Sequence, residues 1–132
     1  MAAGINILVN DGGAPCRIMK LGNAGADLDA GTIVEFNSSG NIVAAAEDLP
    51  SYLNAAVGVL FVDATSGDPA SVITGKGAVV FLKATGTIAA ADALGHDASG
   101  LAKACTTADQ RFALALEAKS ATHTDFVKAL LL

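Results

Sequence analysis

The most constraining feature of this sequence is a segment that occurs twice, sixty residues apart. The first copy spans 25–44 and the second spans 85–104. In each copy an apolar run precedes a polar turn ending in Ser-Gly, and a second apolar run follows, which predicts strand, turn and strand. At constant spacing the aligned pairs are Leu28 with Ile88, Ala30 with Ala90, Val34 with Leu94, Ser39 with Ser99, Gly40 with Gly100, and Ala44 with Ala104.

The similarity between the two copies extends loosely into the segments that follow them. The apolar runs 57–60 and 112–115 each come after a polar interval, and each is succeeded by a turn and another apolar run. We therefore predict an all-β fold, a small barrel or sandwich built from two related β halves with at most one or two short helices. The β-rich domain would span 25–132, with an internal repeat of about 25–84 and 85–132.

Residues 1–24 differ from the repeated part and form a separate predicted segment. Ile5, Ile7 and Val9 alternate with other residues, as in a short strand, and 10–15 reads Asn-Asp-Gly-Gly-Ala-Pro, which is typical of a turn. Residues 16–21 form a second short apolar run. This segment is predicted to be either an arm that reaches a neighbouring subunit or an ordinary edge strand.

Composition excludes several classes of function. Charged residues make up 16% of the chain, against about 25% in typical soluble domains, while hydrophobic residues make up 52%. Such a surface favours burial in an oligomer or on a larger assembly. The net charge of -5 and the scattered cations argue against nucleic acid. The apolar runs are far shorter than the about 20 residues of a membrane helix, and the N-terminus lacks signal-peptide features, which predicts a cytoplasm-like compartment.

No catalytic or metal-binding motif stands out. His96 occupies a turn position that Phe36 holds in the first copy, and the carboxylates lie mainly in turns, where Asp accepts hydrogen bonds from local backbone groups. Two cysteines, Cys16 and Cys105, cannot form a metal site alone, and we expect two thiols. The sequence therefore predicts no enzyme, no cofactor and no metal. One candidate for a small enzyme stays open, His123 with Asp125, because a His-x-Asp pair can orient a base or hold a metal.

A second alternative function depends on one lysine. The runs 70–74 and 77–82 are predicted strands joined at Gly75-Lys76, which has the chemistry of a hairpin turn. Lipoyl- and biotinyl-carrier domains also present a lysine at a hairpin tip within two related β halves. The flanking glycines depart from the carrier motif, and a solvated lysine in a Gly-rich hairpin explains the pattern as well. A prosthetic-group carrier or small binding module using Lys76 is kept as the alternative.

Together these elements resemble a known family, the small capsid decoration (cement) proteins of tailed bacteriophages. The likeness covers about 25–132. The residues that carry it are Leu28-Asp-Ala-Gly-Thr-Ile-Val34, Ser39-Gly40, Val57-Gly-Val-Leu60, Ser66-Gly-Asp68 and Ile88-Ala-Ala-Ala-Asp-Ala-Leu94. The second copy departs from the pattern with Ala91-Asp92, where Gly-Asp is expected.

The resemblance implies a β-rich structural protein, commonly a homotrimer, on the outer capsid surface of a virion. It would be made in the host cytoplasm, bind the major capsid protein after shell expansion and stabilise the shell. No catalysis, nucleic acid or membrane is implied. If residues 1–24 form an arm, the expected capsid-contact residues are Ile5, Ile7, Val9, Arg17 and Lys20. Many weak contacts on one lattice would give retention by avidity.

Overall fold

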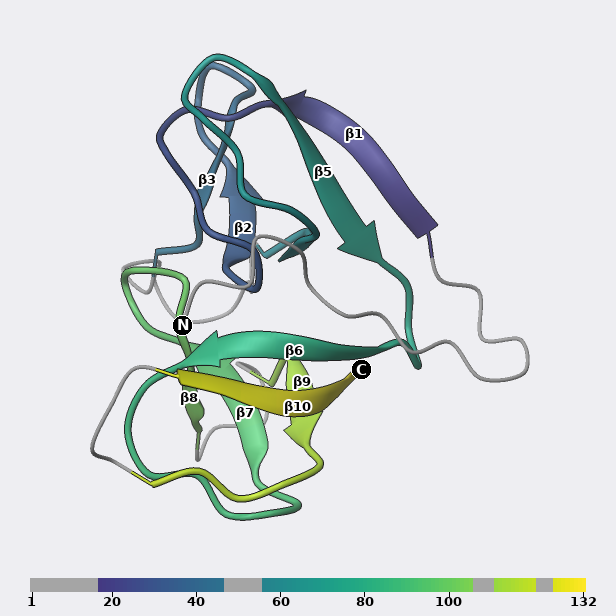
Figure 1. Ribbon diagram of the computed structural model, residues 1–132, viewed down its shortest axis with the longest axis vertical. Helices are drawn as coiled ribbons and strands as arrows, with labels where there is room; N and C mark the ends of the chain where they lie inside the picture. The colour runs from purple at the N-terminus through teal and green to yellow at the C-terminus, as the bar shows by residue number, and fades with distance from the viewer. Residues whose placement is uncertain (1–16, 47–55, 106–110, 121–124) are drawn as a thin grey trace.

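The structure, a computed structural model, describes residues 17–46, 56–105, 111–120 and 125–132. These ranges contain ten β-strands and no helix, so the predicted all-β class is confirmed (Figure 1). The strands are β1 (Arg17–Asn23), β2 (Ile33–Phe36), β3 (Ile42–Ala44), β4 (Gly58–Leu60), β5 (Pro69–Thr74), β6 (Val79–Ala84), β7 (Ala93–His96), β8 (Ala102–Ala104), β9 (Ala113–Ala115) and β10 (Asp125–Leu131).

The strands gather into two groups of five, which we call the first half (β1–β5) and the second half (β6–β10). The first half is a sheet in the order β1-β5-β4-β2-β3, and the second is a closed barrel in the order β10-β6-β8-β7-β9. Figure 1 shows the first half above the second. Alternating burial along β6 and β10 explains why these segments form strands, since successive side chains point to opposite faces of a sheet.

The two halves repeat one arrangement at the level of single residue pairs. In β2 and β3, Val34 pairs with Ala44; sixty residues later, in β7 and β8, Leu94 pairs with Ala104. The barrel closes through one parallel pair between β6 and β8, Ala84 with Ala102. The edges of the first sheet meet through the corresponding parallel bridge, Ala24 with Ile42. The halves are therefore the same five-stranded unit.

The repeated turns are held by equivalent side chains. Asn37 Oδ1 accepts hydrogen bonds from the backbone N–H groups of Ser39 and Asn41, both at 2.9 Å. In the second half, Asp97 Oδ1 accepts the same two bonds, from Ser99 at 2.8 Å and Leu101 at 3.0 Å. A short polar side chain that bonds its own turn explains why Asn and Asp both serve here.

The repeat also relates β1 to β6. β1 pairs with β5 as β6 pairs with β10, and the β1 register shifts between Lys20 and Gly22, so one extra residue lies in β1. The division of the chain at residue 24 stays a prediction. Its described part, β1, is the strand at the edge of the first sheet, and residues 1–16 lie outside the described residues.

The predicted hairpin at Gly75-Lys76 is wrong. β5 pairs with β1 and β4, whereas β6 pairs with β10 and β8, so the two strands belong to different halves. The physical reason is that Gly75 and Gly77 both have positive φ, 129° and 89°, and turn the chain out of one sheet and into the other. Lys76 is therefore an exposed residue of a connection between the halves.

Two clusters of buried side chains form the core. One lies within the first half and includes Leu28, Val34, Ile42, Leu60 and Val72. The other fills the second barrel and continues into the first half through Ile33, Ala45, Val59 and Ile73. The halves thus share one core at their junction. Two hydrogen bonds of 2.9 Å also cross it, from Ile33 N–H to Gly100 O and from Lys83 N–H to Gly31 O.

Ala91 is the one non-glycine residue with positive φ, 72°, in the part of the chain that the structure describes. It occupies the place of Gly31, where φ is 89°. Left-handed backbone costs an L-residue about 1–2 kcal/mol, which glycine would relieve. Glycine also gives the unfolded chain more conformational entropy, and this offsets about 0.4–1 kcal/mol of the gain. We therefore expect Ala91→Gly to raise the free energy of unfolding by about 0.5–1 kcal/mol. Urea denaturation tests this, with Ala90→Gly as the control; stabilisation by both variants, or by neither, would contradict the assignment.

Candidate functional site

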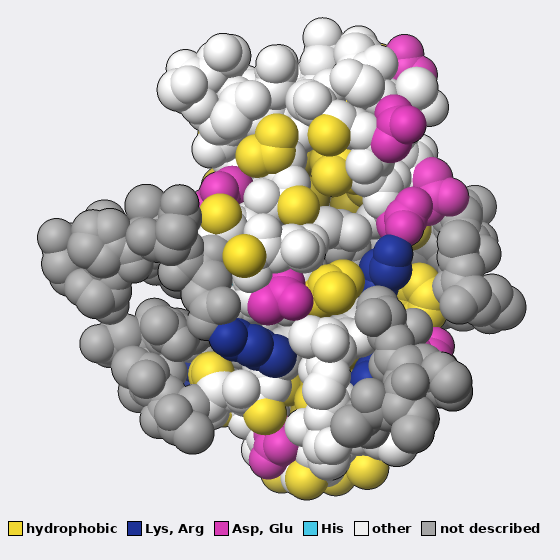
Figure 2. Space-filling view, turned by 90° about the vertical axis from the view of Figure 1, so that its left-hand side faces the viewer, with side chains coloured by type: hydrophobic (Ala, Val, Ile, Leu, Met, Phe, Trp, Pro, Cys, Tyr) yellow, Lys and Arg dark blue, Asp and Glu magenta, His cyan; other side chains and the backbone are white. Residues whose placement is uncertain are grey.

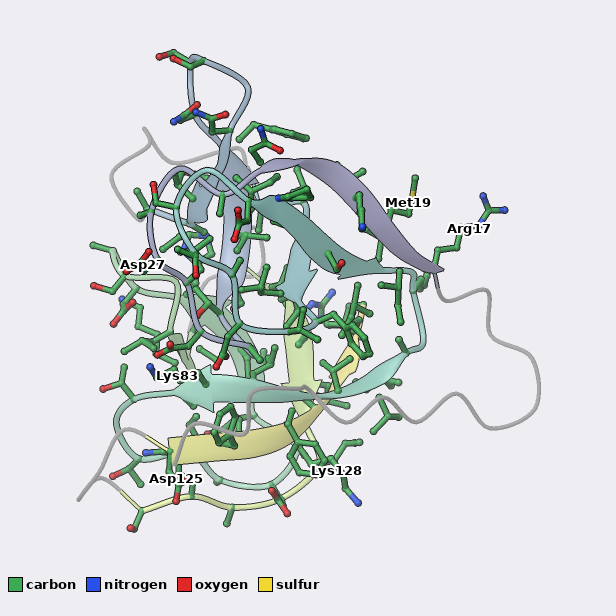
Figure 3. All side chains as sticks on the ribbon, turned by 45° about the horizontal axis from the view of Figure 1, so that its top comes forward. Arg17, Met19, Asp27, Lys83, Asp125 and Lys128 are labelled. Carbon is green, nitrogen blue, oxygen red and sulfur yellow. The ribbon has the colours of Figure 1, made fainter. Side chains whose placement is uncertain are left out.

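β1 is the most exposed strand of the first half. Ile18 and Met19 keep 45% and 41% of their surface accessible, and Arg17 and Lys20 are exposed as well. β1 lies at the edge of its sheet, with β5 on one side. In Figure 3, Arg17 and Met19 point away from the body of the molecule. Exposed apolar side chains on an edge strand are typical of a surface that another chain covers.

The register assigns the side chains of β1 to two faces. Residues directly opposite each other in an antiparallel pair share a face. Ile18 is opposite Ile73, which belongs to the shared core, while Met19 is opposite Val72 of the first-half core. Met19 also accepts a hydrogen bond on Sδ from Thr74 Oγ1 at 3.8 Å. Lys20 therefore shares the face of Ile18, and Arg17 shares the face of Met19.

The structure places only part of the predicted contact set. Ile5, Ile7 and Val9 lie outside the described residues, and Arg17 and Lys20 stand on opposite faces of β1. The exposed apolar pair Ile18 and Met19 was missed, because it reads as ordinary strand sequence. Its position between two cations was the available signal.

A hollow of about 570 Å³ lies where the halves meet, near the Lys83–Asp29 contact. Lys83 Nζ is 2.5 Å from Asp29 Oδ2, and 29% and 50% of the two side chains are accessible. An ion pair this exposed is worth at most about 1 kcal/mol. On the face shown in Figure 2, charged and apolar side chains are interspersed. The hollow is lined by Asp27, Leu28, Asp29, Thr32, Ala44, Lys83, Ser99, Leu101, Asp125 and Phe126.

Of the residues considered for chemistry, the structure describes Asp125 and His96. Asp125 begins β10 and accepts a hydrogen bond from Phe126 N–H at 2.8 Å, while His123 lies outside the described residues. His96 ends β7, and its Nδ1 is 3.1 Å from Asp97 O. Within the four described ranges, no three His, Cys, Asp or Glu side chains are grouped to hold a metal ion. Among these same residues, no helix is long and apolar enough to span a membrane.

Lys76 does not have the position that the attachment lysine has in a carrier domain. It lies in the connection between β5 and β6 and borders a hollow of about 270 Å³ between the halves, together with Thr74, Arg111, Phe112 and Leu131. A carrier lysine needs a projecting hairpin tip, and β5 and β6 do not form a hairpin. Nothing in the described part of the chain favours this alternative.

Comparison with solved structures gives a match along almost the whole chain. The crystal structure of the head fiber gp8.5 N base in bacteriophage phi29 matches with a TM-score of 0.66 and 17% sequence identity, covering 96% of this chain and 95% of that one. The two proteins share a fold. Neither a protein-family model nor a curated protein sequence matches the chain. At this sequence identity the likeness extends to the arrangement of the strands and no further.

Proposed function

We propose that this protein is a structural component of a tailed-bacteriophage virion, located on the outer surface of the capsid. There it binds the major capsid protein as a homotrimer and stabilises the expanded shell. The observation that carries the proposal is the shared fold with a phage head fiber base, which covers nearly the full length of both chains. That fold agrees with the family that the repeated sequence segments resemble.

The described surface supports attachment through shape and apolar contact. Charged residues make up only 16% of the chain, and Ile18 and Met19 are exposed on an edge strand. Each contact of this kind is weak, but many copies on one lattice are retained by avidity. The proposed capsid contacts are those of the N-terminal segment: Ile5, Ile7, Val9, Arg17 and Lys20. Lys20 is the described residue chosen to test them, because its side chain is exposed and lies on the face of β1 opposite to Met19.

Binding to capsids tests this proposal. Heads of the phage that encodes the chain, prepared without this protein, are sedimented with added protein before and after expansion. We expect saturable binding to expanded heads only. Deletion of residues 1–16 leaves β1 intact, and we expect it and Lys20→Glu each to weaken binding at least about tenfold, which is about 1.4 kcal/mol per contact set.

Lys76→Glu is the matched control, because it reverses the charge of an exposed lysine that lies in the connection between the halves. It should bind as the unmodified chain does. Absence of binding to expanded heads would contradict the proposed function. Unchanged binding by the deletion and by Lys20→Glu would instead remove the contact set and leave the function standing.

A further inference from the structure

A row of four apolar side chains crosses the first sheet, and three of them are buried at the junction. Ile33 is opposite Val59, Val59 is opposite Ile73, and Ile73 is opposite Ile18. The first three are fully buried, in one cluster with Ala78, Val80 and Leu131 of the second barrel, whereas Ile18 keeps 45% of its surface exposed. This row is the surface by which the first half packs on the second.

The second half carries the same row. Ala93 is opposite Leu114, Leu114 is opposite Leu130, and Leu130 is opposite Val79. All four are only partly buried. Leu116, which follows β9 as Phe61 follows β4, is 41% exposed, while Phe61 packs against the shared core. The surface that the first half buries at the junction, at Ile33, Val59 and Ile73, therefore has a partly exposed equivalent on the second half.

The surface of the second half on which the first-half row packs also has an equivalent surface on the first half. In the second half, Val80 of β6 is opposite Ala129 and fully buried, in the cluster that also holds Ile33, Val59 and Ile73 of the first half. In the first half the matching position is Met19, opposite Val72, and it is 41% exposed. We call Arg17, Met19 and Thr74, which share one face, the β1 end.

We propose that a second copy of this chain covers both surfaces: the row Val79, Ala93, Leu114 and Leu130 of one copy packs on the β1 end of the next. The two contacting surfaces differ, so the contact is heterologous and closes into a ring when the rotation between copies allows it. This contact specifies how the chains of the proposed homotrimer meet, and the number of three copies in the ring rests on the proposed function. It moves Arg17 from the proposed capsid contacts to the contact between copies and leaves Lys20, on the opposite face of β1, for the capsid.

The contact reuses the apolar part of the junction and not its hydrogen-bonded part. Gly31 lies so close to the second half that a Cβ would be 2.8 Å from Phe126 Cε1, and the second half has Ala91 in that place. In the first half, a Cβ on Gly22 would be 2.9 Å from Gly40 O. Gly22 and the turn at Gly40 therefore lie too close together to admit a segment of another copy between them. Neither of these two places belongs to the apolar row or to the β1 end.

Two substitutions of exposed residues test the contact, one on each surface. Leu116→Asp and Met19→Asp place a carboxylate on the row side and on the β1 end, and Phe36→Asp, at a residue 43% exposed elsewhere, is the matched control. We expect light scattering to give the mass of three chains for the unmodified protein and for Phe36→Asp, and of one chain for the other two. Circular dichroism confirms folding of each variant.

Mixing the two variants provides the decisive experiment. Each monomeric variant keeps one intact surface, so an equimolar mixture of Leu116→Asp and Met19→Asp retains one good contact and should rise toward the mass of two chains with concentration. A mixture that stays at one chain throughout, or single variants that keep the unmodified mass, would overturn the proposal. So would an unmodified chain that is monomeric throughout, even if it binds heads; failure to bind heads by a trimer built on this contact would overturn the proposed function alone.

Discussion

Gly100→Ala should lower the free energy of unfolding by about 3–5 kcal/mol, while Gly40→Ala, at the equivalent turn, should lower it by only about 1–2 kcal/mol. Both glycines have positive φ, 72° and 79°, so both variants strain the backbone alike. They differ in surroundings. A Cβ on Gly100 would be 2.5 Å from Ile33 O and 2.8 Å from Thr32 Cγ2, whereas nothing lies within 4 Å of one on Gly40.

The difference arises because Gly100 belongs to the junction between the halves. Its carbonyl accepts the hydrogen bond from Ile33 N–H, so the turn and β2 cannot separate without losing that bond. Chemical denaturation of both variants, followed by circular dichroism, measures the effect. Equal losses would mean that the two halves do not press together at this turn, and the shared core would have to be reconsidered.

Ile73→Ala should cost about 3–4 kcal/mol of unfolding free energy, and Leu130→Ala, at the equivalent position of the second half, about 1–2 kcal/mol. Ile73 is fully buried in the cluster that joins the halves, whereas Leu130 is only partly buried. Truncating a buried side chain removes its transfer free energy and leaves a cavity, and a partly exposed side chain has less of both to lose.

Denaturant unfolding of the monomeric Met19→Asp background separates this stability from any association. We expect one cooperative transition for all variants, because the core is continuous between the halves. Two transitions in Ile73→Ala alone would show that the junction couples two units that fold separately. A loss for Leu130→Ala as large as for Ile73→Ala would contradict the difference in burial between the two rows.

Where the spacing is constant, residues aligned in the sequence take equivalent positions in the structure. The strands β2, β3, β7 and β8 and their two turns stand sixty residues apart and share a register, so aligned residues revealed them. Beyond these hairpins the alignment fails. The extra residue in β1 shifts its pairing by one, and the exposed Arg17 and Lys20 do not resemble the largely apolar β6.

The junction could not be read from the sequence for physical reasons. The Gly75-Lys76-Gly77 segment has the residues of a hairpin turn, and only the pairing of β5 and β6 with other strands shows that it connects two halves. Val59 and Leu114 are both apolar strand residues, and nothing in their local sequence tells which one the other half covers. The exposed apolar pair of β1, Ile18 and Met19, escaped notice for the same reason.

Electron cryomicroscopy of expanded heads, with and without the added protein, tests the central claim most directly. We predict additional density on the outer surface of the capsid, in groups of three chains over the major capsid protein, that fits this ten-stranded fold. Heads that show no added density at saturating protein, or density at sites away from the major capsid protein, would contradict the account.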